Sequence, residues 1–137
     1  MAYFQSSQQL QDVLGGFFQR LFDHPQIGPK LREANLKLQF QYSDPELSIS
    51  ADTAQNPVKL LFNDASFKPE VQMSMKADVA HRFWHGKVNL IAALTRREMV
   101  AKGPIPKILK LLPAIKPAYD LYPEYLKEKG MENLILK

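Results

Sequence analysis

The chain has 137 residues, of which 45% are hydrophobic and 23% are charged, and it contains no cysteine. This composition is typical of a folded globular protein, and it excludes disulfide bonds, cysteine nucleophiles and cysteine metal ligands. The longest apolar run, residues 90–94, is far shorter than the roughly 20 residues that cross a bilayer, and the N-terminus does not resemble a secretory signal. We therefore expect one cytoplasmic domain over residues 1–137.

The net charge is +4, and the whole surplus lies in the last third of the chain. Residues 1–95 carry nine basic and nine acidic side chains, whereas residues 96–137 carry nine basic and five acidic ones. Most of this surplus falls between Arg96 and Lys116. A local positive field attracts the phosphates of nucleic acids, anionic lipids or phosphorylated ligands, although a solvated basic surface is an equally common explanation.

Residues 7–23 carry the pattern of an amphipathic helix, because their apolar side chains recur at i, i+3, i+4 and i+7. Ser6 or Ser7 is suited to cap the N-terminus of this helix. The pair Gly15-Gly16 lowers helix propensity in the middle of the segment and leaves room for close packing. A second, short helix is predicted for residues 29–35.

The period then changes to two, which predicts β-strands over residues 36–42, 47–52, 58–63 and 71–76. Each of these segments alternates apolar and polar side chains. The alternation favours a largely antiparallel sheet with one face toward water, because the strands of a buried parallel sheet are apolar on both faces.

Helical signals return after the fourth strand. Asp78 is suited to cap a helix that ends at Gly86, and Asn89 is suited to cap a second helix through Leu94. A fifth strand is predicted over residues 98–102. The expected fold is therefore α+β, with helices over one face of a five-stranded, mostly antiparallel sheet.

Prolines are frequent in the C-terminal part of the chain. Pro104 or Pro106 is expected to open a helix through Leu112, and the last helical stretch is predicted over residues 124–129. Three further prolines are expected to break the rest into short turns: Pro113, Pro117 and Pro123. The predicted parts are an N-terminal helix (7–23), a unit of sheet and helices (36–112) and a proline-rich segment (113–137).

No catalytic or metal site is predicted. His81 and His85 have the i, i+4 spacing of zinc-protease helices, but Arg82 takes the place of the glutamate and no third ligand is near, so both are expected on the surface. No serine lies in a G-x-S-x-G turn, and no glycine-rich phosphate loop follows a strand. We predict that the protein is not an enzyme and uses no cofactor or metal. A small hydrolase of lipid esters is an alternative that needs a nucleophile or metal absent from this pattern.

Nucleic-acid binding is not predicted, because most aromatic residues fall on faces that are expected to form the core. Tyr119, Tyr122 and Tyr125 lie near lysines and are the exception. The prolines among them prevent a regular stacking stripe.

The inner face of the predicted sheet is rich in methionine and aromatic side chains, which adapt to irregular partners. Beside Phe83 and Trp84, this face would line a lipid pocket, although a filled core also explains the pattern. Residues 105–112 add an apolar stripe flanked by Lys107 and Lys110. Helices on membrane surfaces and helices that cover a core share this pattern.

The order of elements over residues 71–103 carries a family resemblance. An apolar strand, a short helix, the dipeptide Gly86-Lys87, a second short helix and a strand that ends in Lys102-Gly103 follow one another in VQMSMKADVAHRFWHGKVNLIAALTRREMVAKG. This segment resembles the sterol carrier protein type-two domain, also called the nonspecific lipid-transfer domain. The neighbouring elements fit the same order over residues 30–115.

The resemblance implies an apolar tunnel enclosed by the sheet and its helices. It also implies non-enzymatic binding and transfer of a lipid such as a fatty acid, a fatty acyl-CoA, a phospholipid or a sterol. The residues expected to line the tunnel are Phe40, Tyr42, Ile49, Leu60, Phe62, Met73, Met75, Phe83, Trp84, Leu90, Leu94, Met99, Ile105, Ile108 and Leu112. The residues expected to contact a lipid head group or a membrane are Arg96, Arg97, Lys107 and Lys110.

The implied partners are a lipid ligand, a transient anionic membrane surface and a lipid-metabolising enzyme. The alternative function is an accessory module that presents a lipidic substrate, such as a quinone precursor, to a biosynthetic enzyme complex.

Overall fold

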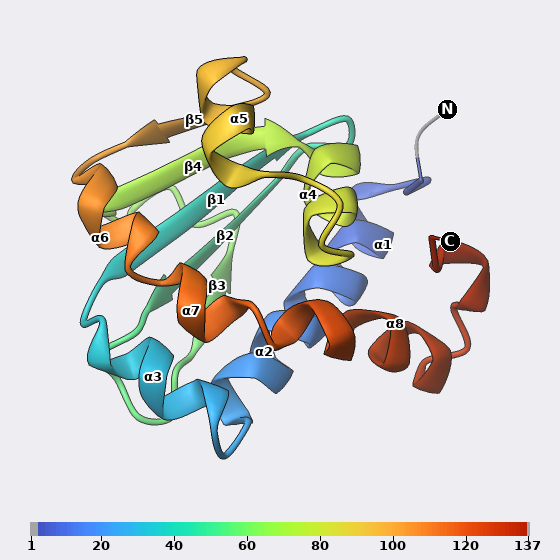
Figure 1. The fold of residues 1–137 in the computed structure, drawn as a ribbon, viewed down its shortest axis with the longest axis horizontal. Helices are drawn as coiled ribbons and strands as arrows, with labels where there is room; N and C mark the ends of the chain where they lie inside the picture. The colour runs from blue at the N-terminus through green and yellow to red at the C-terminus, as the bar shows by residue number, and fades with distance from the viewer. Residues whose placement is uncertain (1–2, 137) are drawn as a thin grey trace.

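The computed structural model describes residues 3–136, and its N-terminal part is helical (Figure 1). Three segments follow one another without a break in helical backbone: α1 (Ser7–Leu10), the π-helical η1 (Gln11–Gly15) and α2 (Gly16–Asp23). The predicted helix over residues 7–23 is therefore present, and the Ser6 hydroxyl caps it by accepting from the Gln9 N–H at 3.0 Å. Helix α3 (Ile27–Glu33) begins two residues before its predicted start.

The sheet has five strands in the order β3-β2-β1-β4-β5, and three of its four pairings are antiparallel. The exception is the central pair β1–β4, which is parallel and places Phe40 opposite Met73. The prediction of an α+β fold with a mostly antiparallel five-stranded sheet is confirmed. The strands are β1 (Lys37–Ser43), β2 (Leu47–Asp52), β3 (Leu60–Phe62), β4 (Val71–Lys76) and β5 (Met99–Lys102).

One face of the sheet packs on helices and the other is polar. On the polar face, Gln39 donates to the Ser50 hydroxyl at 3.1 Å and accepts from Gln72 at 2.7 Å. The apolar side chains of β1, β2 and β4 point the other way, because successive residues of a strand face opposite sides. They face the helical layer that contains α2 and α4 (Figure 1).

Two short helices precede the last strand, α4 (Ala77–Trp84) and α5 (Leu90–Thr95). Asn89 caps α5 as predicted, since its side-chain oxygen accepts from the Ala92 N–H at 3.0 Å. Asp78 does not cap α4. Strand β4 runs directly into this helix, so that Lys76 is the N-cap residue and Asp78 lies in the first turn, where it accepts from the Tyr3 N–H at 2.9 Å.

The C-terminal part is more helical than predicted. It contains α6 (Ile105–Leu109), α7 (Leu112–Ile115), α8 (Ala118–Glu128) and the 3₁₀ turn η2 (Glu132–Leu134). Pro113 lies in the first turn of α7, where a missing N–H costs no hydrogen bond. Pro123 lies inside α8, so the expected break at this proline is wrong. The buried side chains Tyr122, Tyr125 and Leu126 offset the lost hydrogen bond by packing α8 on the core.

Tyr125 explains the Gly15-Gly16 pair. Its hydroxyl donates to the Val13 carbonyl at 2.8 Å, within the π-helical segment. A Cβ atom on Gly16 would lie 2.4 Å from this hydroxyl, and one on Gly15 would lie 2.8 Å from the Phe62 ring. The two glycines therefore let α8 and β3 approach the N-terminal helix.

Within residues 3–136, no helix is both long and apolar enough to cross a bilayer.

Candidate functional site: an apolar lumen between sheet and helices

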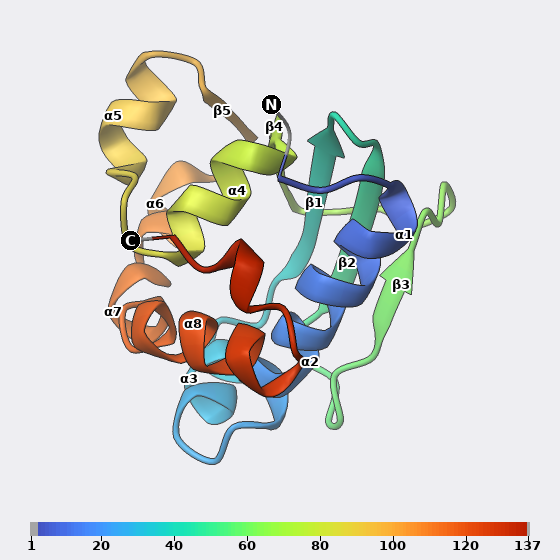
Figure 2. The ribbon, with the colours of Figure 1, turned by 90° about the vertical axis from the view of Figure 1, so that its right-hand side faces the viewer.

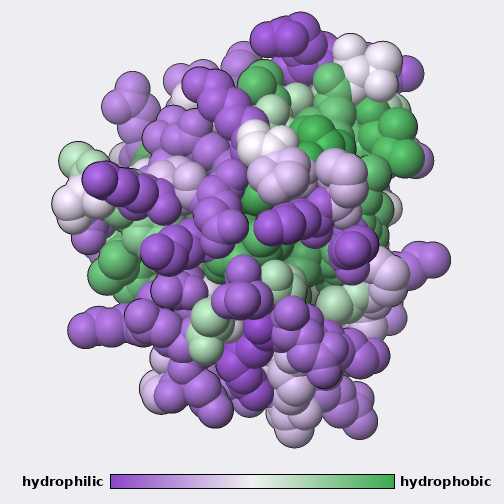
Figure 3. Space-filling view, turned by 90° about the vertical axis from the view of Figure 1, so that its left-hand side faces the viewer, coloured by the Kyte–Doolittle hydropathy of each residue, from purple (hydrophilic) through white to green (hydrophobic). Residues whose placement is uncertain are grey.

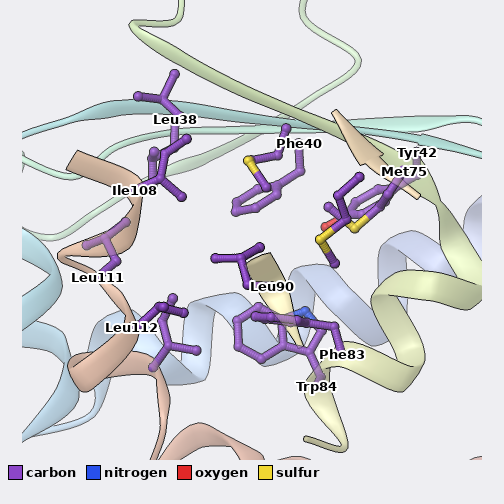
Figure 4. A pocket seen from close by; sticks show the side chains of 14 residues that line it. Leu38, Phe40, Tyr42, Met75, Phe83, Trp84, Leu90, Ile108, Leu111 and Leu112 are labelled. Atoms are coloured by element: carbon purple, nitrogen blue, oxygen red, sulfur yellow. The ribbon is translucent and has the colours of Figure 1, made fainter. Parts of the chain in front are cut away.

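A cavity with about 580 Å³ of empty space, its opening included, lies between the inner face of the sheet and the helices α4 to α7 (Figure 4). We call it cavity 1. The strands supply its roof and the helices its floor in this view. Its walls are formed by Leu38, Phe40, Tyr42, Val71, Met73, Met75, Phe83, Trp84, Leu90, Met99, Ile108, Leu111, Leu112 and Ile115.

A second cavity, with about 490 Å³ of empty space, lies next to cavity 1 and extends toward α2 and α3. We call it cavity 2. The two cavities share five wall residues, Leu38, Phe40, Trp84, Leu111 and Ile115. The two cavities are therefore adjacent, and we refer to them together as the apolar lumen and to each as one of its chambers. The other walls of cavity 2 are Phe18, Leu21, Phe22, Leu31, Ile49, Ala51 and Leu60.

The lumen contains almost no polar side-chain atoms. Only Tyr42 and Trp84 bring a side-chain oxygen or nitrogen to its walls, and within residues 3–136 neither atom has a hydrogen-bond partner. Burial raises the pKa of Tyr42 well above its ordinary value, with a smaller contribution from Tyr122, so the phenol is neutral. Such a space suits a long apolar chain and offers no charged group for acid–base chemistry.

Most of the residues predicted to line a tunnel lie on these walls. Ten of the fifteen line cavity 1, and Ile49 and Leu60 line cavity 2 together with Phe40 and Trp84. Three line neither chamber: Leu94 and Ile105 are half-buried against the core, and Phe62 packs against Gly15.

Sequence reasoning left several wall residues out. Alternation placed Leu38 on the inner face of the sheet, although it was not among the predicted lining residues, and Val71 lies on the same face and could have been identified in the same way. Leu111 follows Ile108 by three positions and was detectable in the same way. Ile115 and the wall residues of α2 were not detectable in this way, because Ile115 was assigned to the proline-rich segment and the α2 residues to the N-terminal helix, both outside the predicted unit of sheet and helices.

The four basic residues that were predicted to contact a head group do not form one cluster. Arg96 and Arg97 precede β5, whereas Lys107 and Lys110 belong to α6 and its end, beyond the opposite end of this strand. Lys107 lies 3.9 Å from a Glu70 carboxylate oxygen, and Arg96 lies 4.0 Å from a Glu98 oxygen. None of the four lines cavity 1 or cavity 2.

The two histidines of α4 are structural groups rather than surface residues. His81 is fully buried, and its Nε2–H donates to the Leu134 carbonyl at 2.6 Å while Nδ1 accepts from the Tyr122 hydroxyl at 2.8 Å. His85 donates from Nδ1 to the His81 carbonyl at 2.8 Å and accepts at Nε2 from the Leu136 N–H at 3.1 Å. The carbonyl partners fix both neutral tautomers.

These histidines tie the C-terminal residues to α4, beside α8 (Figure 2). Burial lowers the pKa of His81 to about 4, with a smaller lowering from His85, against a raising effect of the Leu134 hydrogen bond. Burial also lowers the pKa of His85. Among residues 3–136, no group of three or more histidine or carboxylate side chains could hold a metal ion.

The fold is that of sterol carrier protein 2, as three solved structures show. Sterol carrier protein 2 from Yarrowia lipolytica matches 88% of this chain and 99% of its own, with a TM-score of 0.65 and 15% identity. The sterol carrier protein domain 2 of Helicoverpa armigera matches 82% of this chain and 87% of its own, with a TM-score of 0.61 and 16% identity.

The third structure is UbiJ-SCP2, described as a ubiquinone synthesis protein. It matches 82% of this chain and 89% of its own, with a TM-score of 0.57 and 16% identity. No protein-family model and no curated protein matches the sequence. The sequence resemblance is therefore confirmed at the level of the fold.

Proposed function

We propose that this protein binds a lipid with a long apolar chain in the lumen and carries it without covalent change. The observation that carries this proposal is the two-chambered apolar lumen at the place where sheet and helices meet. In this structure the two chambers have only about 60 and 50 Å³ of accessible volume, less than the roughly 300–1,000 Å³ of a typical small-molecule site, so binding of a long chain requires the wall side chains to move apart. Each methylene group that moves from water into the lumen contributes about 0.8 kcal/mol.

The proposal assigns a carrier role and no catalysis. The only polar side-chain atoms at the walls are a neutral phenol and an indole N–H, which can donate hydrogen bonds but cannot serve as a base near neutral pH. His81 and His85 use both ring nitrogens in hydrogen bonds that hold the C-terminal residues. We also retain the expectation of a cytoplasmic protein, which cell fractionation tests.

The first test is to extract the gently purified protein with organic solvent and to quantify the lipids per chain by mass spectrometry. Met73→Glu places a carboxylate on the wall of cavity 1, so we expect this variant to lose both co-purified lipid and a fluorescent fatty acid added afterwards. Met131→Glu, outside the lumen, is the matched control. Equal binding by both folded variants would show that the lumen is not the lipid site.

We propose that the lumen meets membranes at α5 and α7. A hollow between these helices shares Leu90 and Leu112 with cavity 1. Ile91 beside it is 61% exposed, and Lys116 lies on its rim. Hydrophobic surface surrounded by hydrophilic groups is visible on the side of the molecule where α6 lies (Figure 3). Basic residues beside exposed apolar ones suit anionic membranes.

Vesicle flotation tests this membrane contact. We expect binding to phosphatidylglycerol vesicles that weakens with salt and is absent from phosphatidylcholine vesicles. The variant Ile91→Gln with Lys116→Gln should bind weakly, and undiminished flotation would refute the contact.

A second candidate function is presentation of a lipidic quinone precursor to a biosynthetic enzyme complex. The observation that favours it is the match in fold to UbiJ-SCP2. Mass spectrometry of the extracted lipid separates the two functions, because this candidate requires a prenylated aromatic compound. It also requires that the protein elute from a native extract in an assembly much larger than its own 15.7 kDa.

A further inference from the structure

A groove with about 1040 Å³ of empty space, its open side included, lies at the end of the sheet where β1 and β4 finish and β5 starts. One side of α4, from Lys76 to Arg82, and the residues between α5 and β5 complete its walls. Unlike the lumen, this groove is lined largely by charged and hydroxyl-bearing residues.

Two residues belong to both spaces. Tyr42 and Met75 line cavity 1 and also line the groove, and they are direct partners in the β1–β4 pairing. They lie together at one end of cavity 1, away from Leu38 and Ile108 (Figure 4). Tyr42 is only 5% exposed, yet its hydroxyl has no hydrogen-bond partner within residues 3–136. No fully buried side-chain oxygen or nitrogen among residues 3–136 lacks a partner, so the Tyr42 hydroxyl keeps some accessible surface and is free to donate to a ligand atom at this boundary.

The groove is positively charged. Lys76 is the N-cap residue of α4, Arg82 lies in the last turn of this helix, and Arg97 extends from the turn before β5, where its φ is +61°. In the part of the chain that the structure describes, none of these three cations forms an ion pair or a side-chain hydrogen bond. The one carboxylate in the groove, Glu98, lies 4.0 Å from Arg96. Ser43 and Ser74 add two hydroxyl groups without partners among the same residues.

The geometry points to a head-group site in this groove, so that the lipid carried in the lumen is an anionic amphiphile with a carboxylate or phosphate head. This inference rests on the proposed carrier function. The apolar chain passes Tyr42 and Met75 into cavity 1, the Tyr42 hydroxyl donates to the head group, and Lys76, Arg82 and Arg97 neutralise its charge. The charged head then stays in water-accessible space, which avoids the cost of burying an ion.

The test compares two ligands that share one chain, hexadecanoate and hexadecan-1-ol, at low salt and at a pH at which the carboxylate is ionised. We expect the wild-type protein to bind hexadecanoate about tenfold more tightly, because only the carboxylate makes charge-assisted hydrogen bonds. The double variant Lys76→Gln/Arg82→Gln should reduce this preference to within about twofold while leaving hexadecan-1-ol binding unchanged. Arg97→Asn, which tolerates the positive φ, is a second variant on the opposite wall.

The control variant is Lys59→Gln/Lys68→Gln, which removes the same charge from exposed positions outside the groove. It should keep the full preference for hexadecanoate. Inorganic phosphate supplies the anion without a chain, and we expect it to compete only weakly. Hexadecyl phosphate should bind as hexadecanoate does.

Each outcome decides one question. If neither chain-bearing ligand binds the wild-type protein, the carrier function and the head-group site both fail. If both ligands bind and the groove variants keep the preference, only the head-group site fails. If inorganic phosphate competes as well as hexadecyl phosphate does, the groove is a free-anion site and the inference is overturned.

Discussion

Ile115 offers a direct way to block the lumen. It lines both chambers and lies half-buried at the end of α7. The substitution Ile115→Trp adds about six heavy atoms at the boundary between the chambers, enough to exclude about four methylene groups of a bound chain. At about 0.8 kcal/mol for each methylene group, the lost binding energy is about 3 kcal/mol, or about two-hundredfold in Kd.

The assay is displacement of a fluorescent fatty acid, with far-ultraviolet circular dichroism and thermal unfolding as checks on the fold. Leu121→Trp is the matched control, because Leu121 is half-buried on α8 and lines neither chamber. Leu112→Trp, on the wall of cavity 1, is a second blocking variant. If both blocking variants fold and bind with wild-type affinity, the chain does not occupy this lumen and the reasoning is refuted.

Three further predictions concern stability. Because the pKa of His81 is lowered from 6.5 to about 4, only the unfolded chain takes up its proton between these values. The unfolding free energy should therefore fall by up to about 3 kcal/mol as pH drops from 6.5 to 4, and urea titrations of His81→Gln should show a shallower fall. Gly103 has a φ of +108° and no room for a Cβ atom, which would meet a backbone carbonyl oxygen at 2.2 Å. Gly103→Ala should cost more than about 2 kcal/mol, whereas Gly130→Ala, which has open space, should cost about 1 kcal/mol in the same titration; equal costs would contradict this. Pro123→Ala restores a helical hydrogen bond in α8 and should raise the thermal midpoint, and a lower midpoint would show that this proline stabilises its turn.

The sheet was predictable because its signal is local. Alternation of apolar and polar residues identified four strands, and the first strand appears at residues 37–43 rather than 36–42. The same alternation identified four of the ten predicted wall residues of cavity 1, Phe40, Tyr42, Met73 and Met75, since a side chain on the inner face of this sheet has few other places to point. Alternation says nothing about which strands pair, so the parallel pairing of β1 with β4 was not predicted.

The C-terminal part was less predictable because packing overrides local preference there. Pro123 breaks helices in isolation, but Tyr122 and Tyr125 are buried against the N-terminal helix and hold α8 together. Ile115 was not expected on the lumen wall either, because it lies in the proline-rich segment (113–137) that was predicted to form short turns.

The spatial grouping of the basic residues was not predictable, because proximity in sequence is not proximity in space. Arg97 and Lys107 are ten positions apart, but β5 runs between them and separates them along the sheet. The structure instead brings Arg97 together with Lys76 and Arg82, which precede it by more than a dozen residues. The burial of His81 could not be predicted from nearby residues either, since its hydrogen-bond partners, Tyr122 and Leu134, are distant in the sequence.

The origin of the lumen walls has a consequence for biosynthesis. The first wall residue of the lumen is Phe18 and the last is Ile115, so the walls come from segments spread over residues 18–115. During translation, the apolar inner face of the sheet emerges well before α7 can cover it. Until α7 has emerged, this face is therefore exposed to chaperones and the lumen lacks its last wall.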